Sequence, residues 1–304
     1  MNVFNDRSKG EKSMTQKEGI VYIDGEFLPK REAKVSVYDH GFLYGDGVFE
    51  GIRTYNGRVF KLDEHIRRLY ESAKSMELSI PVSKEDMMKT ILETIGRSGL
   101  KDAYIRVVVT RGVGDLGLDP RKCPKPSIII IVDTIVVWKE RSLKAITATT
   151  RRNAASALNP MVKSLNYLNN ILAKLEANRS NVDEAIMLNQ QDLVCEGTGD
   201  NMFIVKDGVI ATPPPSANMI VGITRSAVME LATKDGLKVE ERDITIHEVY
   251  NADEAFLTGT AAEVMPLVEV DGKRIGNGEP GPITMTLIER FNDIKRSGTP
   301  VDYE

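Results

Sequence analysis

Helical periodicity is the clearest pattern along the chain. Apolar residues recur three and four positions apart over several stretches of ten or more residues, which is the spacing of one face of an α-helix. The stretch 84–98 is an example, because Ile91 and Ile95 lie on one such face and Ser83 stands where a helix cap is expected. The pattern predicts helices over residues 64–76 (with Asp63 as cap), 84–98, 168–179, 224–234 and 283–295.

Strands are predicted between these helices. The turn signals Asp24-Gly25, Asn56-Gly57 and Asp207-Gly208 lie between short runs of β-favouring residues and predict hairpins. The longest apolar run, 128–132, fits one buried strand and is too short to cross a membrane. The apolar strand 103–110 contains Arg106, and a charged side chain there is costly unless an anion pairs with it.

Length and composition indicate a globular protein with two domains. The 304 residues suffice for two cores, and 41% hydrophobic and 28% charged content are ordinary for this class. Residues 1–18 are polar and aperiodic, so we expect a disordered extension there. The net charge of −4, with scattered cationic residues, argues against nucleic acid or membrane as partners. The two cysteines and three histidines form no cluster, so we expect no metal site and a reducing, cytoplasmic location.

One lysine stands out by its position. Lys163 follows Pro160 and Met161 and precedes Leu165 and Tyr167, just ahead of the predicted helix 168–179. A lysine in an apolar cleft loses its charge easily and can form a Schiff base with an aldehyde. Most lysines are surface residues, so this segment alone favours an ordinary solvated lysine. The motifs elsewhere in the chain change that balance.

Several glycine-bearing motifs accompany the lysine. Glu196 opens the segment Glu-Gly-Thr-Gly-Asp-Asn-Met-Phe, in which an acidic residue precedes a glycine-rich turn. The others are Tyr44-Gly-Asp-Gly-Val-Phe-Glu-Gly-Ile-Arg53, Ala103-Tyr-Ile-Arg106, Gly222-Ile-Thr-Arg225 and Gly259-Thr-Ala-Ala-Glu263. Taken in this order, over about residues 20–291, they resemble the class IV, fold type IV, pyridoxal-phosphate enzymes. Within that class the chain looks most like the branched-chain amino acid aminotransferases.

The resemblance implies an α+β fold with the two-domain architecture of the D-amino acid aminotransferase type. A small N-terminal α/β domain would span residues 19–132, and a loop over 133–142 would join it to the second domain. That second domain, residues 143–304, would be a larger pseudo-barrel that binds the cofactor. The only tryptophan, Trp138, falls in the interdomain loop, and its role stays open.

The resemblance also implies pyridoxal 5'-phosphate as the cofactor and assigns residues to it. Lys163 would be the catalytic lysine, which binds the cofactor and then moves the substrate's Cα proton. Glu196 would keep the pyridine nitrogen protonated, and Tyr167 would hydrogen-bond the phenolic oxygen. Arg68 would bind the phosphate, since a guanidinium can form two parallel hydrogen bonds to it. The remaining contacts would come from Gly199, Ile223, Thr224 and Thr260, with the start of the helix 224–234 as an anion site.

For the substrate, the resemblance implies a pocket that accepts first an apolar side chain and then the second carboxylate of glutamate. Tyr44, Phe49 and Tyr104 would contact the apolar side chain, and Arg106 would pair with the carboxylate. The backbone at Thr260 and Ala261 would hold the α-carboxylate. Leu118 lies in the glycine-rich loop 112–119 with no evident core to join, and it would reach the pocket of the second subunit of a homodimer. A higher assembly of such dimers stays open.

These assignments predict transamination of L-leucine, L-isoleucine and L-valine with 2-oxoglutarate, with small amino acids and 2-oxo acids as the partners. A D-amino acid aminotransferase or an aminodeoxychorismate lyase on the same fold would keep Lys163 and Glu196. The segments Glu50-Gly-Ile-Arg53 and Gly259-Thr-Ala-Ala-Glu263 speak against both. A non-catalytic protein that binds the cofactor is a further alternative, of another class.

Overall fold

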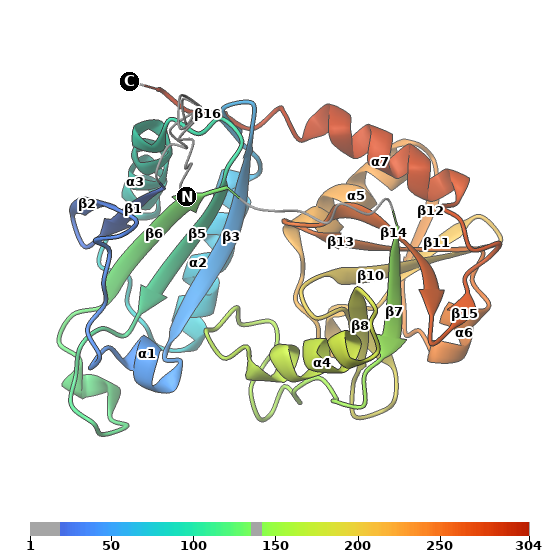
Figure 1. The fold of residues 1–304 in the computed structure, drawn as a ribbon, viewed down its shortest axis with the longest axis horizontal. Coiled ribbons are helices and arrows are strands. Elements are labelled where there is room, and N and C mark those ends of the chain that lie inside the picture. The colour runs from blue at the N-terminus through green and yellow to red at the C-terminus, as the bar shows by residue number, and fades with distance from the viewer. Residues whose placement is uncertain (1–18, 135–141, 304) are drawn as a thin grey trace, which may run out of the picture.

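The fold consists of two sheets with helices packed against each (Figure 1). The computed structural model describes residues 19–134 and 142–303, so the predicted extension 1–18, most of the predicted loop 133–142 and Trp138 lie outside the described residues. Helices and strands are mixed along the chain, and the α+β fold class expected from the sequence is confirmed. The boundaries of the two domains stay a prediction.

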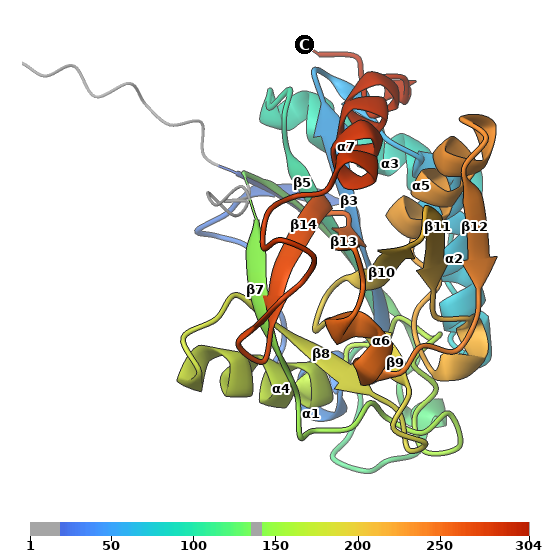
Figure 2. The same ribbon diagram turned by 90° about the vertical axis from the view of Figure 1, so that its right-hand side faces the viewer.

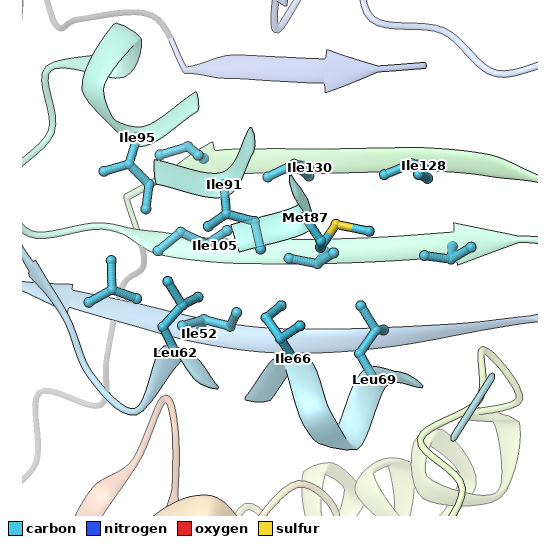
Figure 3. Close-up of a cluster of buried hydrophobic side chains, with 14 of the residues drawn as sticks. Ile52, Leu62, Ile66, Leu69, Met87, Ile91, Ile95, Ile105, Ile128 and Ile130 are labelled. Carbon is cyan, nitrogen blue, oxygen red and sulfur yellow. The ribbon is translucent and has the colours of Figure 1, made fainter. Parts of the chain in front are cut away.

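The first sheet is antiparallel and has the strand order β16-β4-β3-β5-β6-β1-β2. Helices α2 and α3 cover one face of it, and Figure 3 shows their side chains meeting those of β3, β5 and β6. Ile52, Ile66, Ile91 and Ile105 are fully buried there, and each contributes about 1.5–3 kcal/mol of burial. The elements are β1 (Ile20–Ile23), β2 (Glu26–Pro29), α1 (His40–Tyr44), β3 (Gly47–Tyr55), β4 (Arg58–Val59), α2 (Leu62–Ser75), α3 (Lys84–Ser98), β5 (Tyr104–Thr110), β6 (Ser127–Asp133) and β16 (Thr299–Pro300).

The second sheet is mixed and curls around its own core (Figure 2). Its order is β12-β11-β10-β13-β14-β7-β8-β9, with β15 paired to β14. Helices α5 and α7 pack on β10, β11, β13 and β14 through an apolar cluster that includes Phe203, Phe256 and Phe291. The elements are β7 (Leu143–Thr147), α4 (Leu168–Arg179), β8 (Glu184–Leu188), β9 (Val194–Glu196), β10 (Asn201–Lys206), β11 (Val209–Thr212), α5 (Ile223–Lys234), β12 (Lys238–Glu241), α6 (Ile246–Tyr250), β13 (Glu254–Gly259), β14 (Glu263–Val270), β15 (Lys273–Arg274) and α7 (Pro282–Ile294).

The five predicted helices are all present as α2, α3, α4, α5 and α7. Ser83 caps α3 as expected, because its side chain accepts from the Asp86 N–H. Asp63 is not the cap of α2: the helix begins at Leu62, two residues before the predicted start, and Lys61 is its N-cap residue. The short helices α1 and α6 were not predicted, since five residues are too few to show a helical period.

Helix α4 buries the opposite face from the one its sequence suggests. Its buried residues are Asn170, Ala173 and Ala177, and the two alanines pack against β7 and β8. The larger apolar side chains point outward: Leu168, Ile171, Leu172 and Leu175 are 66%, 52%, 45% and 41% exposed. The helix therefore carries an apolar face that the described residues of the chain leave uncovered.

The end of the chain returns to the first sheet. After α7, Thr299 pairs with Val59 in β4, and Val301 is buried in the first core. Figure 1 shows this return, with α7 leading from the second sheet toward β16. Of the helices in residues 19–134 and 142–303, none is long and apolar enough to span a membrane.

Candidate active site

Lys163 lies where the two sheets meet. By sequence it belongs with the second sheet, but its backbone is bound to the first: its carbonyl accepts from the Phe49 N–H at 2.9 Å, and its own N–H donates to Ser72 Oγ at 3.2 Å. Its side chain reaches Tyr167, with Nζ donating to Oη at 3.3 Å, and lies 4.7 Å from the centre of the Phe49 ring. An amine, a phenol and an aromatic face are thus gathered at one point.

Lys163 lines two cavities. The smaller, about 100 Å³, is lined by Arg68, Gly199, the start of α5 and the turn after β13. The larger, about 470 Å³, is lined by aromatic and charged side chains. The residues that line both are Tyr104, Lys163, Gly199 and Ala261. A ligand that fills both cavities would contact the lysine.

Arg68 at the smaller cavity is held by a buried carboxylate. Its Nε and Nη2 donate to Glu50 at 2.6 and 2.9 Å, and Nη1 donates to the Val221 carbonyl at 2.7 Å. Glu50 therefore binds the Nε and Nη2 donors of Arg68, the pair of donors that we expected on a phosphate. The remaining Nη hydrogens are left for the phosphate. Burial would raise the pKa of Glu50, but Arg68 and His65 outweigh it and hold that pKa well below its usual range.

His65 completes this group. Burial lowers the pKa of the His65 ring, although Glu50 opposes the shift. His65 Nδ1 lies 2.8 Å from Glu50 Oε2 and donates a hydrogen bond to that carboxylate. Glu50 thus orients Arg68 from behind, and His65 fixes Glu50.

The rest of the smaller cavity suits an anion such as a phosphate. Helix α5 begins at Ile223, and no side chain of the described residues caps it, so its first N–H groups are open. Thr258 lines the same cavity, and its buried hydroxyl has no hydrogen-bond partner among the described residues. The smaller cavity therefore brings together the Arg68 cation, the uncapped start of α5 with Thr224, and the hydroxyl-bearing residues Thr258 and Thr260.

Glu196 lies behind this cavity and is paired. Its Oε1 accepts from Arg152 Nε at 2.7 Å, and its Oε2 accepts from the Ile220 N–H at 3.1 Å. The side chains of Glu196 and Arg152 are almost fully buried. Burial raises the pKa of Glu196, and the Arg152 guanidinium opposes that rise. Arg152 had no role in the sequence analysis, although a pair of arginines just after a strand could have marked one as buried.

The larger cavity has an aromatic and cationic wall built by β3 and β5. Phe49, Gly51 and Arg53 share one face of β3, and Gly51 and Arg53 lie opposite Arg106 and Tyr104. Gly51 is needed here, because a Cβ on it would come 2.1 Å from Tyr104 Oη. The Arg106 guanidinium lies 4.5 Å from the Phe49 ring centre. Its Nη2 donates to Tyr104 Oη at 3.0 Å, while its buried Nε lacks a partner within the described residues.

The floor of the larger cavity is acidic. Asp200 is buried beside Lys174 and Glu184, and desolvation together with the Glu184 charge raises the pKa of Asp200 to about 7. Glu184 in turn accepts from the Thr198 N–H at 3.1 Å. Asp200 appeared in a motif of the sequence but had no assigned role, because burial cannot be read from a glycine-rich turn.

Three of the predicted site residues, Tyr44, Leu118 and Glu196, line neither cavity in this chain. Tyr44 donates from Oη to the Leu116 carbonyl at 2.5 Å, so α1 supports the loop 112–119. Leu116 and Leu118 at the tip of that loop are 68% and 80% exposed. The other predicted residues line the cavities, and Glu196 contacts the cavity residues Ile220 and Asn201.

Comparison with known proteins gives consistent matches. The family model described as "Amino-transferase class IV" matches residues 47–270. A Methanocaldococcus jannaschii protein named "Putative branched-chain-amino-acid aminotransferase" is 55% identical over 276 residues, which cover 90% of this chain and 96% of that protein. The structure of a branched-chain aminotransferase from Thermoproteus uzoniensis with norvaline has a TM-score of 0.88 at 39% identity, covering 92% of this chain and 95% of that one. The structure of the Escherichia coli branched-chain amino acid aminotransferase has a TM-score of 0.89 at 33% identity, covering 93% of this chain and 96% of that one.

Proposed function

Since the chain belongs to the class IV aminotransferases, we propose that it transfers the amino group of L-leucine, L-isoleucine and L-valine to 2-oxoglutarate with pyridoxal 5'-phosphate as cofactor. The products would be the branched 2-oxo acids and L-glutamate. The observation that carries the proposal is the position of Lys163, which lines both an anion-binding cavity and an aromatic pocket with one arginine.

The residues around the smaller cavity fit pyridoxal phosphate. Arg68, the N–H groups of Ile223 and Thr224, and Thr260 would hold the phosphate, and the unpaired Thr258 hydroxyl supports an anion at this place. When bound, the cofactor withdraws electrons from the Cα of an attached amino acid and makes its proton acidic. Lys163 Nζ would take up that proton and return it, and Tyr167 would orient the lysine through their hydrogen bond.

Glu196 would face the pyridine nitrogen. A carboxylate there favours a protonated nitrogen, and Arg152 opposes the loss of that negative charge on burial. Gly199 lines both cavities and has nothing within 4 Å of the site where a Cβ would stand. It would leave room for the flat ring.

The larger cavity suits the two substrates in turn. Phe49 and Tyr104 would contact a branched aliphatic side chain, and the Thr260–Ala261 backbone would hold the α-carboxylate. The Arg106 guanidinium has a buried Nε that lacks a partner within the described residues, and it would bind the second carboxylate of 2-oxoglutarate. Each charged hydrogen bond of this kind contributes about 1.5–3 kcal/mol.

We also propose a homodimer with a shared pocket. Leu116, Leu118, Tyr44 and the outer face of α4 are exposed and apolar, as at a protein interface. Leu118 would then contact the substrate bound to the partner subunit. Larger assemblies of dimers stay open, and the cytoplasmic location stays a prediction.

A panel of amino acids tests the substrate assignment. Purified protein reconstituted with pyridoxal phosphate is mixed with L-leucine, L-isoleucine, L-valine, D-alanine and 4-amino-4-deoxychorismate, and the visible absorbance of the cofactor is followed. Rapid change with the branched L-amino acids, and recovery on adding 2-oxoglutarate, is expected. A preference for D-alanine, release of pyruvate from the chorismate compound, or cofactor binding without any half-reaction would each overturn the proposal in favour of one alternative.

A further inference from the structure

Two of the motifs that pointed to the branched-chain group are bound to each other. Arg53 ends the segment Glu50–Arg53 on β3, and Glu263 ends the segment Gly259–Glu263 at the start of β14. Arg53 Nη1 donates to Glu263 Oε1 at 2.8 Å across 210 residues of sequence. The side chains are 13% and 21% exposed, so this ion pair joins the two sheets at their interface.

Glu263 occupies a backbone position where a side chain is unusual. Residues 260–262 form the short loop between β13 and β14, and Glu263 follows it with a φ of 60°, in the left-handed region. Such hairpin positions favour glycine, because it adopts positive φ without steric cost. Glu263 takes this position with its carboxylate bound from two sides, because the Nζ of Lys295, the residue after α7, also contacts it at 2.7 Å.

Arg53 holds the same loop from the pocket wall. It lies opposite Tyr104 in the register of β3 and β5, and Gly51 on the same face lies opposite Arg106. Tyr104 lines both cavities together with Ala261. The ion pair is therefore a direct charged link between the strand pair that carries Tyr104 and Arg106 and the turn that carries Thr260 and Ala261.

We propose that the Arg53–Glu263 ion pair sets the position of the Thr260–Ala261 turn relative to the Tyr104–Arg106 wall. Through this link it fixes where the α-carboxylate of an amino or oxo acid lies with respect to its side chain. Arg53 and Glu263 are thus positioning residues for substrate specificity. The part of the proposal that concerns the carboxylate rests on the proposed function, and the part that concerns the turn does not.

Different results are expected if the ion pair only stabilises the fold. It would add to stability, and its loss would leave ligand affinity unchanged in the protein that still folds. Lys295 offers the matched control, because Lys295→Met removes a cation from the same carboxylate and leaves the link between the sheets intact. An effect that appears in both Arg53→Met and Glu263→Gln but not in Lys295→Met is then assigned to that link.

The first experiment measures binding of 4-methylpentanoate, a branched carboxylic acid without an amino group, to the holoenzyme through the cofactor absorbance. Arg53→Met and Glu263→Gln are each expected to weaken binding about fivefold or more. The double variant should bind no more weakly than the single variant that has the lower affinity. Lys295→Met should stay within about twofold of the parent. Unchanged affinity in Arg53→Met, or an equal loss in Lys295→Met, would overturn the proposal.

The second experiment does not depend on the substrate. Hydrogen–deuterium exchange of the segment 259–263 should be about fivefold faster in Arg53→Met than in the parent or in Lys295→Met, because the turn loses its link to β3. If the parent binds no acid and turns over no branched amino acid while this exchange difference is seen, the proposed function fails and the positioning of the turn stands. Equal exchange in the three proteins would refute the positioning role itself.

Discussion

The two sides of the Lys163 pocket differ in how completely one chain builds them. On the cofactor side the charged groups are buried and paired, Arg68 with Glu50 and Glu196 with Arg152. On the substrate side the loop 112–119 exposes Leu116 and Leu118, and Tyr44 supports the loop instead of lining a cavity. Under the proposed assignments, one chain would therefore complete the anion site and supply half of the substrate site. The difference implies that cofactor binding and substrate binding respond to separate sets of substitutions.

The largest effect is expected where the two sides meet. Lys163→Ala removes the group assigned to proton transfer and should lower transamination about 10³-fold or more, with little change in folding. The matched control is Lys174→Ala, which removes another lysine of the larger cavity. Steady-state rates and the visible absorbance of both variants test this, and substantial turnover in Lys163→Ala would remove that lysine from the mechanism.

The substrate side alone is tested at Leu118. Leu118→Asp should reduce branched-chain turnover about a hundredfold, because an unpaired charge would enter an apolar contact, and cofactor affinity should stay unchanged. Leu118→Met is the conservative control.

Subunit mixing decides which chain Leu118 serves. Leu118→Asp and Lys163→Ala proteins are combined under conditions that exchange subunits, and activity is followed. A shared site predicts that heterodimers regain one working pocket. No gain, with exchange demonstrated by mass spectrometry, would mean that the loop serves its own subunit.

The cofactor side alone is tested at Arg68. Arg68→Ala should weaken pyridoxal phosphate binding about ten- to a hundredfold, which is the loss of one charged contact of about 1.5–3 kcal/mol. Arg67→Ala is the control, because Arg67 is exposed and pairs with Asp63 on the outside of α2. Equilibrium titration of the apoprotein measures both. Unchanged cofactor affinity with altered leucine specificity would move Arg68 to the substrate side.

The smallest effect concerns pH. The pKa of Asp200 is raised from 3.8 to about 7, so the folded protein binds a proton there that the unfolded chain releases between these values. Stability from this group is thus full below about pH 4 and is lost as pH rises through 7. Asp200→Asn should remove the dependence, a difference of about 1 kcal/mol or more in the free energy of unfolding.

Urea unfolding of the apoprotein at about pH 5 and about pH 8, on either side of the raised pKa, measures the Asp200 effect. Asp293→Asn, an exposed position on α7, serves as the control. From the lower to the higher pH, the free energy of unfolding of the parent should fall relative to that of Asp200→Asn. An equal change in both proteins would show that the pKa of Asp200 is not raised.

The sequence predicted elements better than it predicted their faces. The apolar period of 168–179 located α4 to the residue, yet its leucines point outward, since only Ala173 and Ala177 are small enough to pack closely on β7 and β8. Periodicity reports that an apolar face exists and cannot say whether the chain itself or a partner covers it.

The same limit applies to the site. Motif matches indicated many of the residues that line the cavities, because glycine-rich turns and an arginine in an apolar strand are local signals. The partners that orient them were missed: Glu50 behind Arg68, Arg152 behind Glu196, and Glu263 opposite Arg53. Each pair is far apart in sequence or lies on different elements, so only the folded chain brings its charges together.

The return of the chain end to the first sheet bears on how this protein is made. Arg58 Nε donates to the Gly298 carbonyl, 240 residues later, and Val301 N–H donates to the Gly57 carbonyl. At about 5–20 residues per second, a ribosome needs roughly ten to fifty seconds to synthesise the intervening chain. During that interval the edge of β4 is unpaired, and a bare strand edge attracts other chains. The first sheet should therefore fold with fewer wrong contacts when a nascent-chain chaperone shields β4. An affinity tag is best kept away from residue 303, because a tag there could hinder the pairing of β16 with β4.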